Sequence, residues 1–290
     1  MSFPFFMEGI MQLKVTKMEA LGNDYIIING WEYGELIRNA EALSRKLSDR
    51  HFGIGGDGII FALPSQNADA MMRIFNADGS EAEMCGNGIR QAAKFLFDNG
   101  IVDKKTMRIE TLAGVKTIAI KTDKNGKMKF ARVDMGAPIL EPEKIPAIAQ
   151  VNNEGFAEIL INGLDYTLVS MGNPHAVTFI ESADNFPVEK IGRNVENNTD
   201  IFPSRTNVEF IEVLSDSEIK MRVWERGSGE TLACGTGACA SVVACVLNGK
   251  TGRNVKVNLL GGTLDIEWAE SGTVFMTGSA NIVFNADLEI

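Results

Sequence analysis

Two stretches of the sequence place a cysteine directly before a Gly-x-Gly pair and an apolar segment of helical periodicity. The first stretch begins at Cys85 and the second at Cys234. Glycine lets the backbone bend into a helix and approach a ligand closely. The first turn of a helix has unpaired N–H groups and a partial positive charge, which stabilise a thiolate and bind carboxylates. Each stretch therefore predicts a thiol of lowered pKa beside an anion site.

Two such helix ends that face each other have the parts needed to invert a stereocentre. One thiolate would remove a proton from one face of a carbon atom, while the other thiol would return a proton to the opposite face. For an α-amino acid, the developing negative charge spreads into the carboxylate, at which both helix N-termini aim fixed dipoles. This chemistry needs a small-molecule substrate but no cofactor, so we expect no cofactor.

The four cysteines allow other interpretations. Cys239 and Cys245 lie inside the second apolar segment, so we expect them to be core residues. A metal site is not expected, because the cysteines form no C-x2-C pair and have no histidine nearby. Cys85 and Cys234 could instead be core residues, or a redox-active or ligand-binding thiol pair without turnover. The recurrence of Gly-x-Gly after both residues favours the catalytic interpretation.

An internal repeat extends well beyond the two cysteines. Asn23 lies 62 residues before Cys85, and Asn173 lies 61 residues before Cys234. Each cysteine is also followed by an Asn-Gly pair after 14 residues and by a Gly-containing turn after about 28 residues. Three coincidences in the same order and at nearly the same spacing indicate two copies of one fold.

Short strand-like runs dominate the elements that must position these residues. Strand character is found in residues 13–18, 25–29, 58–63, 70–75, 106–111, 117–121, 128–134, 165–170, 176–180, 208–213, 219–224, 255–260, 263–268 and 273–279. Helical character is found in residues 33–49, 87–98, 186–192 and 236–247. Many short strands with one apolar helix in each copy are typical of the α+β class.

We therefore expect two pseudo-symmetric α+β halves, each a curled, barrel-like sheet of mixed or antiparallel strands around one central helix. The N-terminal half is expected to comprise residues 1–130 and a returning C-terminal strand, residues 278–290. The C-terminal half is expected to comprise residues 131–277. Because the chain has 290 residues, each half is long enough to bury its own core.

The overall composition disfavours several classes of function. The formal net charge of −10, without a run of Lys or Arg, disfavours nucleic-acid binding. No apolar stretch reaches the roughly 20 residues that span a bilayer, so we expect no membrane segment. Residues 1–11 are apolar but lack a basic n-region, so we expect an extension ahead of the first strand rather than a signal peptide. Three of the four cysteines fall within twelve residues, which favours free thiols and a cytoplasmic location.

Six segments resemble the diaminopimelate epimerase family, whose members interconvert LL- and meso-diaminopimelate without a cofactor. The segments are KMEALGNDY (17–25), DRHFGIGGDG (49–58), FNADGSEAEMCGNGIR (75–90), MGNPHAV (171–177), RTNVEF (205–210) and ERGSGETLACGTGACA (225–240). The resemblance runs from about residue 13 to the C-terminus. Related proline racemases usually carry histidine where this chain has Asn87, which favours the epimerase.

The resemblance implies a role for each matching residue near the thiols. Cys85 and Cys234 are implied to be the acid–base pair, exchanging roles with reaction direction. His175 and Glu225 are implied to lie beside the thiols and to tune their protonation. Backbone cradles for the α-carboxylate are implied at Gly86, Asn87, Gly235 and Thr236.

The resemblance also implies contacts to the rest of the substrate. Hydrogen bonds to substrate are implied for Asn23, Asn76, Asn173 and Asn207. Glu225 and Arg226 would bind an ammonium and a carboxylate of a substrate that is ionised at both ends. Without the resemblance, each assignment has a structural alternative. Asparagines at turns often bond only to their own backbone. His175 would be interpreted as a structural residue, and a Glu-Arg pair often lies in a solvated loop.

The resemblance further implies a homodimer and a place in lysine and peptidoglycan precursor synthesis. A racemase of another amino acid on the same fold is an alternative function. Arg226 argues against that alternative, because an arginine is suited to bind a second carboxylate of the substrate.

Overall fold

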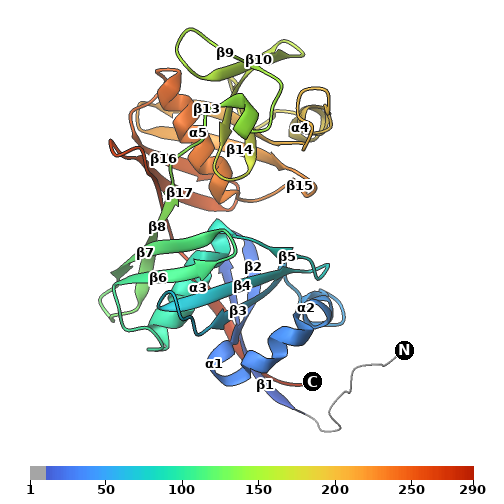
Figure 1. Ribbon diagram of the computed structural model, residues 1–290, viewed down its shortest axis with the longest axis vertical. Coiled ribbons are helices and arrows are strands. Elements are labelled where there is room, and N and C mark those ends of the chain that lie inside the picture. The colour runs from blue at the N-terminus through green and yellow to red at the C-terminus, as the bar shows by residue number, and fades with distance from the viewer. Residues whose placement is uncertain (1–10) are drawn as a thin grey trace.

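The structure is a computed structural model that describes residues 11–290 (Figure 1). The expected N-terminal extension, residues 1–11, therefore lies outside the described residues except for its last one. Figure 1 shows two lobes, each a curled sheet around one long helix: α3 (Gly86–Asp98) in the first lobe and α5 (Gly235–Leu247) in the second. The expected α+β architecture of two similar halves is confirmed.

The first lobe contains most of the N-terminal half of the chain. Its strands are β1 (Gln12–Ala20), β2 (Asn23–Asn29), β3 (Gly58–Leu63), β4 (Ala70–Asn76), β5 (Glu81–Ala82), β6 (Thr106–Thr111), β7 (Gly114–Thr122) and β8 (Met128–Gly136). Its other helical segments are α1 (Gly30–Tyr33), the 3-10 helix η1 (Gly34–Asn39) and α2 (Ala40–Ser48).

From residue 164 onward, the second lobe repeats this order of strands, with α5 in the place of α3. Its strands are β9 (Gln150–Val151), β10 (Ala157–Ile161), β11 (Leu164–Ser170), β12 (Pro174–Phe179), β13 (Asn207–Ser215), β14 (Glu218–Glu225), β15 (Gly229–Glu230), β16 (Asn254–Leu259), β17 (Gly262–Trp268) and β18 (Val274–Gly278). Its other helices are η2 (Pro142–Lys144) and α4 (Val188–Glu196), and the chain ends with β19 (Asn281–Glu289).

The strand pairings of the first lobe are also repeated in the second lobe. In the first lobe β2 pairs in parallel with β3, and β4 pairs in parallel with β6 after the crossover through α3. In the second lobe β12 pairs in parallel with β13, and β14 pairs in parallel with β16 after the crossover through α5. The neighbouring pairs β3–β4, β6–β7, β13–β14 and β16–β17 are all antiparallel. The internal repeat of the sequence is therefore a repeat of topology.

Two strands join the lobes. Strand β8 pairs with β7 on one side and with β18 on the other. Strand β19 then returns to the first lobe, where it pairs with β1. A boundary at residue 130 falls inside β8, which contributes to both sheets, and the division at that residue remains a prediction.

The two central helices begin and end through the repeated residues. Cys85 and Cys234 are the N-caps, and each sulfur accepts a hydrogen bond from the backbone N–H three residues later. At the other end, the side chain of Asn99 donates to the Phe95 carbonyl at 2.8 Å, and Gly100 has a φ of +67°. The second copy closes in the same way at residues 248 and 249. The 14-residue offset is thus one helix with its caps.

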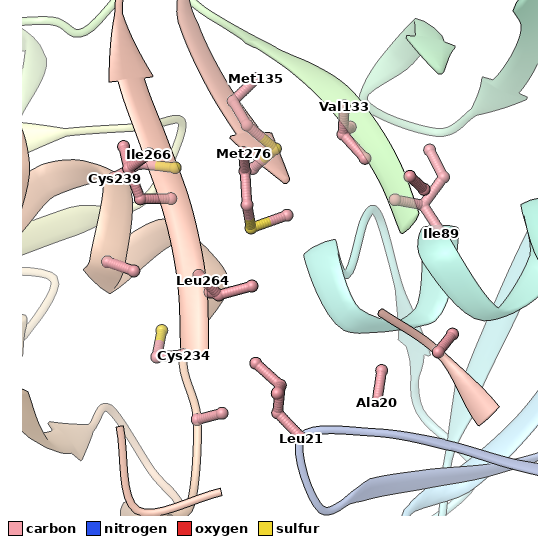
Figure 2. Close-up of a cluster of buried hydrophobic side chains, with 14 of the residues drawn as sticks. Ala20, Leu21, Ile89, Val133, Met135, Cys234, Cys239, Leu264, Ile266 and Met276 are labelled. Atoms are coloured by element: carbon pink, nitrogen blue, oxygen red, sulfur yellow. The ribbon is translucent and has the colours of Figure 1, made fainter. Parts of the chain in front are cut away.

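The largest of three apolar clusters among the described residues runs through both lobes. It includes most of α3 and α5 and the inner faces of the two sheets. Figure 2 shows the Met276 side chain of β18 between Cys239 of α5 and Ile89 of α3. Cys239 and Cys245 are fully buried free thiols, as expected for core residues.

Differences from the expected elements are local. The stretch 33–49 is divided among three short helical segments that begin at Gly30, and α4 ends at Glu196 rather than at residue 192. Strands β5, β9 and β15 were not expected, because each has only two residues and therefore no periodic pattern, and β10, with the sequence AEILI, was also missed. Among residues 11–290, none of the helices combines the length and apolar character needed to cross a bilayer.

Candidate active site

A cleft of about 1660 Å³ contains most of the residues predicted for the site. The predicted residues that line it are Asn23, Asn76, Cys85, Gly86, Asn87, Asn173, Glu225, Arg226, Cys234, Gly235 and Thr236. They come from both lobes, so the cleft lies where the two copies of the fold meet. Its volume exceeds the roughly 300–1,000 Å³ of typical small-molecule pockets.

The N-termini of α3 and α5 touch at the floor of this cleft. A Cβ atom built on Gly86 would lie 3.7 Å from the Gly235 Cα, and one built on Gly235 would lie 3.6 Å from the Gly86 Cα. The amide of Asn87 donates to the Ala233 carbonyl at 3.3 Å and so bonds across the two lobes. A Cβ atom at either glycine would also lie 3.0 Å from the Met276 side chain, so larger residues there would crowd Met276. The contact brings both cysteines, each one residue earlier, to one place.

Cys85 is surrounded by polar groups of the first lobe. Its thiol donates to Asn23 Oδ1 at 3.6 Å, and the Tyr25 hydroxyl approaches its sulfur at 3.9 Å as a donor. Burial raises the pKa of Tyr25 well above its ordinary value of 10.0, so this hydroxyl keeps its proton. The amide of Asn23 donates to Asp57 Oδ2 at 2.6 Å. Asn23 is therefore fixed by side-chain partners and does not bond to its own turn.

Cys234 has the matching set of neighbours in the second lobe. Its sulfur lies 3.5 Å from the Thr236 hydroxyl, which accepts a hydrogen bond from the Asn173 amide at 3.3 Å. The oxygen of the same amide lies 3.1 Å from Nε2 of His175. Glu225 also lies in the cleft and accepts a hydrogen bond from the Thr231 hydroxyl.

His175 does not line the cleft but lies directly behind it. It is fully buried on β12, and its Nδ1 is 2.7 Å from Oε1 of the buried Glu209 on β13. The other carboxylate oxygen of Glu209 has no hydrogen-bond partner among the described residues. A Cβ atom built on Gly237 would lie 2.6 Å from Glu209 Oε1, so glycine in the first turn of α5 leaves room for this carboxylate.

The thiol pKa values are raised, whereas the sequence favoured lowered ones. Burial raises the pKa of the Cys85 thiol above its ordinary value of 9.0, although the Gly88 N–H and the Tyr25 hydroxyl act in the opposite direction. The pKa of the Cys234 thiol lies well above 9.0, first because of burial and then because of the carboxylates of Glu225 and Glu209. The N–H groups of the helices do favour the thiolates, but desolvation outweighs them.

Asn207 and Arg226 are linked to each other. The Asn207 amide is buried, donates to the Pro174 carbonyl at 2.8 Å and accepts from the Arg226 backbone N–H at 2.9 Å. Asn207 does not line the cleft, so its substrate contact remains a prediction. Arg226 reaches the cleft from an exposed turn and donates to the Ser204 carbonyl at 2.9 Å.

Sequence reasoning missed Tyr25, Asp57 and Glu209. A period of two places Tyr25 on the same face of its strand as Asn23, and Glu209 on the same face as Asn207. A charged residue within an apolar strand was therefore the available signal for Glu209. Asp57 carried no signal, because its bond to Asn23 joins segments 34 residues apart.

Comparisons with known proteins agree over nearly the whole chain. The sequence model of the diaminopimelate epimerase family matches residues 15–141 and 167–283. A diaminopimelate epimerase of Acetivibrio thermocellus is 51% identical over 281 residues, covering 96% of this chain and 99% of the relative. One from Methanococcus maripaludis is 52% identical, covering 96% of this chain and 100% of the relative.

Solved structures share the fold at low sequence identity. A PhzF-family phenazine biosynthesis protein of Bacillus anthracis matches with a TM-score of 0.68 and 18% identity, covering 97% of this chain and 100% of that chain. A hydroxyproline epimerase of Agrobacterium vitis matches with a TM-score of 0.68 and 13% identity, covering 96% and 93%. The full-length sequence matches then identify the branch of this fold: the chain belongs to the diaminopimelate epimerase family.

Proposed function

We propose that the protein converts LL-diaminopimelate to meso-diaminopimelate with Cys85 and Cys234 as the acid–base pair. The observation that carries the proposal is the contact between the N-termini of α3 and α5, with one thiol at each. A carboxylate at this contact would receive N–H groups from both helices. The adjacent α-carbon would then lie between two sulfurs that approach from opposite lobes.

In the proposed reaction, one cysteine acts as a thiolate and the other as a thiol. The thiolate removes the α-proton, the negative charge moves into the carboxylate, and the thiol donates a proton to the opposite face. The raised pKa of each thiol makes its thiolate a stronger base once formed, and the two dipoles stabilise the charge that develops. His175 is proposed to act through Asn173 on the Thr236 hydroxyl beside Cys234.

The remaining groups of the cleft suit a substrate with a second charged end. We propose that the carboxylate of Glu225 faces an ammonium group and that Arg226 binds a carboxylate. Asn23, Asn76 and Asn173 offer amide groups along the walls between them. The product would serve lysine and peptidoglycan precursor synthesis, and because both thiols must stay reduced, we propose a cytoplasmic location.

The test is epimerisation in deuterated water. LL-diaminopimelate incubated with the protein, without pyridoxal phosphate and with EDTA, should yield meso-diaminopimelate that carries deuterium at the inverted α-carbon. Chiral chromatography with mass spectrometry measures both changes, and enantiopure proline, glutamate and lysine serve as the comparison panel. Labelling of one of these amino acids but not of diaminopimelate would establish the alternative racemase, and no labelling at all would refute turnover.

We also propose that the protein is a homodimer whose subunits meet along β19. Among residues 11–290, β19 pairs only with β1, so its outer edge is open. Ile282, Val283 and Phe284 on this strand are 41%, 55% and 43% exposed. An apolar edge strand of this kind invites pairing with another chain, and a second copy presents the same strand.

Replacing Phe284 by Asp is therefore expected to yield monomers, because it would place a carboxylate in the proposed apolar interface. Sedimentation equilibrium at micromolar concentration measures the change. Leu160→Asp is the matched control, since Leu160 is an exposed apolar residue on β10 of the other lobe. A wild-type monomer, or a Phe284→Asp dimer, would contradict the proposed interface.

A further inference from the structure

Arg90 is a cation buried at the centre of the molecule. It is 0% exposed and is among the largest side chains of the protein that are fully enclosed. It lies on α3 in the second turn after Cys85, on the side of the helix that faces the second lobe. Burial lowers the pKa of Arg90 to about 10, so the guanidinium still carries its charge at neutral pH.

The hydrogen-bond partners of this guanidinium are all uncharged. Arg90 donates to the carbonyls of Gly86 and Ser279 at 2.9 and 3.2 Å and to Asn87 Oδ1 at 2.8 Å, and it contacts the Met276 sulfur at 3.5 Å. Within residues 11–290, no carboxylate lies at salt-bridge distance from it. A buried charge without a counter-ion is strongly unfavourable unless another anion compensates for it.

The position of the guanidinium indicates which anion that is. Its partners Gly86 and Asn87 are the first two residues of α3, and both line the cleft beside Cys85. Gly86 also touches Gly235 at the start of α5. The cation is therefore directly behind the place where both helix dipoles converge and where the Cys85 thiolate forms.

Only one copy of the repeat has this cation. Arg90 follows Cys85 by five residues, and the residue that follows Cys234 by five is Cys239. Cys239 is a buried core thiol whose pKa is raised by burial to about 12. Cys234 instead has the carboxylates of Glu225 and Glu209 nearby. Glu225 also raises the pKa of Cys85, so the two thiols differ in the buried cation that follows Cys85 and has no equivalent after Cys234.

We propose that Arg90 is a positioning residue that supplies the counter-charge for the anions at the Cys85 helix end, namely the Cys85 thiolate and, during the proposed reaction, the substrate carboxylate. It acts through the backbone of Gly86 and the side chain of Asn87, which it holds in place. One guanidinium serves both helix ends, because the two ends are in contact. The part that concerns the carboxylate rests on the proposed function, whereas the part that concerns the thiolate does not.

Other charged and titratable groups also face this thiol, and the test must separate them from Arg90. Tyr25 on β2 approaches the Cys85 sulfur, and Glu225 on β14 raises the Cys85 pKa. Cys234 on α5 lines the same cleft. The carboxylate of Glu19 on β1 raises the pKa of Arg90. All of these groups remain in place when only residue 90 is changed.

The experiment measures the rate of Cys85 alkylation by iodoacetamide against pH in the substrate-free protein, with peptide mass spectrometry to separate Cys85 from Cys234. Arg90→Met is expected to shift the midpoint for Cys85 upward by about one pH unit, which is a roughly tenfold lower rate at pH 8. Arg90→Lys should retain most of the wild-type profile, because it keeps the charge. Lys94→Met is the matched control, since Lys94 is a largely buried cation at the far end of α3 that pairs with Asp98.

An unchanged Cys85 midpoint in folded Arg90→Met would overturn the proposal. If Arg90→Met does not fold, Arg90→Gln provides a second neutral side chain of similar length, and the same midpoint decides. Epimerisation is measured in parallel, with kcat/KM expected to fall about 100-fold in Arg90→Met and less in Arg90→Lys. Because alkylation needs no substrate, a shifted midpoint in a protein that fails to epimerise would support Arg90 while refuting the proposed function.

Discussion

Replacing either Cys85 or Cys234 by alanine is expected to abolish epimerisation, by on the order of 10⁴-fold or more, while diaminopimelate still binds. Each variant lacks the group that serves one face of the α-carbon, so a proton that is removed cannot be returned to the opposite face. Binding should persist because the N–H groups of α3 and α5, the wall asparagines and Arg226 remain. Chiral chromatography measures turnover, and calorimetric titration with meso-diaminopimelate measures binding.

The matched control for these variants is Cys239→Ala. Cys239 lies on α5, is fully buried and is outside the cleft. Removing its sulfur should leave turnover close to that of the wild type and lower the free energy of unfolding by about 1–2 kcal/mol. Epimerisation by Cys85→Ala or Cys234→Ala at a few per cent of the wild-type rate would eliminate the two-thiol mechanism.

Replacing Glu225 by Gln is expected to lower kcat/KM by about 10²–10³-fold and to move its pH profile to lower pH. The loss of rate follows from removing the partner of a substrate ammonium, at about 2–5 kcal/mol for a desolvated charge pair. The shift follows from the thiols, because the Glu225 carboxylate raises the pKa of Cys234 and, more weakly, of Cys85. Without that charge both pKa values fall.

The sign of the shift can be checked on both limbs of the profile. The reaction needs one thiolate and one thiol, so the rate rises as the first thiol ionises and falls as the second does. Both limbs should therefore move toward lower pH in Glu225→Gln. Glu218→Gln on the same strand is the control, because Glu218 bonds to Asn258 away from the cleft. An unmoved profile would leave Glu225 without an electrostatic role.

The sequence was most informative where the structure is local. The helix expected at 87–98 is observed at Gly86–Asp98, because the residues that begin and end it lie directly next to it in the sequence. The repeat likewise predicted two copies of one fold and a pair of equivalent cysteines. Nearly equal spacings can be recognised in the sequence without any knowledge of contacts. Eleven of the site residues that the family resemblance implied line one cleft.

Properties that depend on long-range contacts could not be predicted. The direction of the thiol pKa shifts depends on burial, which the helix motif does not reveal. An arginine in a helix is usually exposed, so the sequence gives no sign that Arg90 is buried. Its burial results from the packing of the two lobes. Only the family resemblance implied a place for His175 beside the thiols, because its partner Glu209 is 34 residues away.

The pairing of β1 with β19 also constrains how the protein is made. Gln12 is aligned with Glu289, so β1 gains this neighbour only after β19, which follows the other strands of the described residues, has been synthesised. By contrast, all strands of the second lobe are present once β18 has been synthesised. A chain that stops after β18 would therefore leave the sheet of the first lobe, not that of the second, without one of its strands.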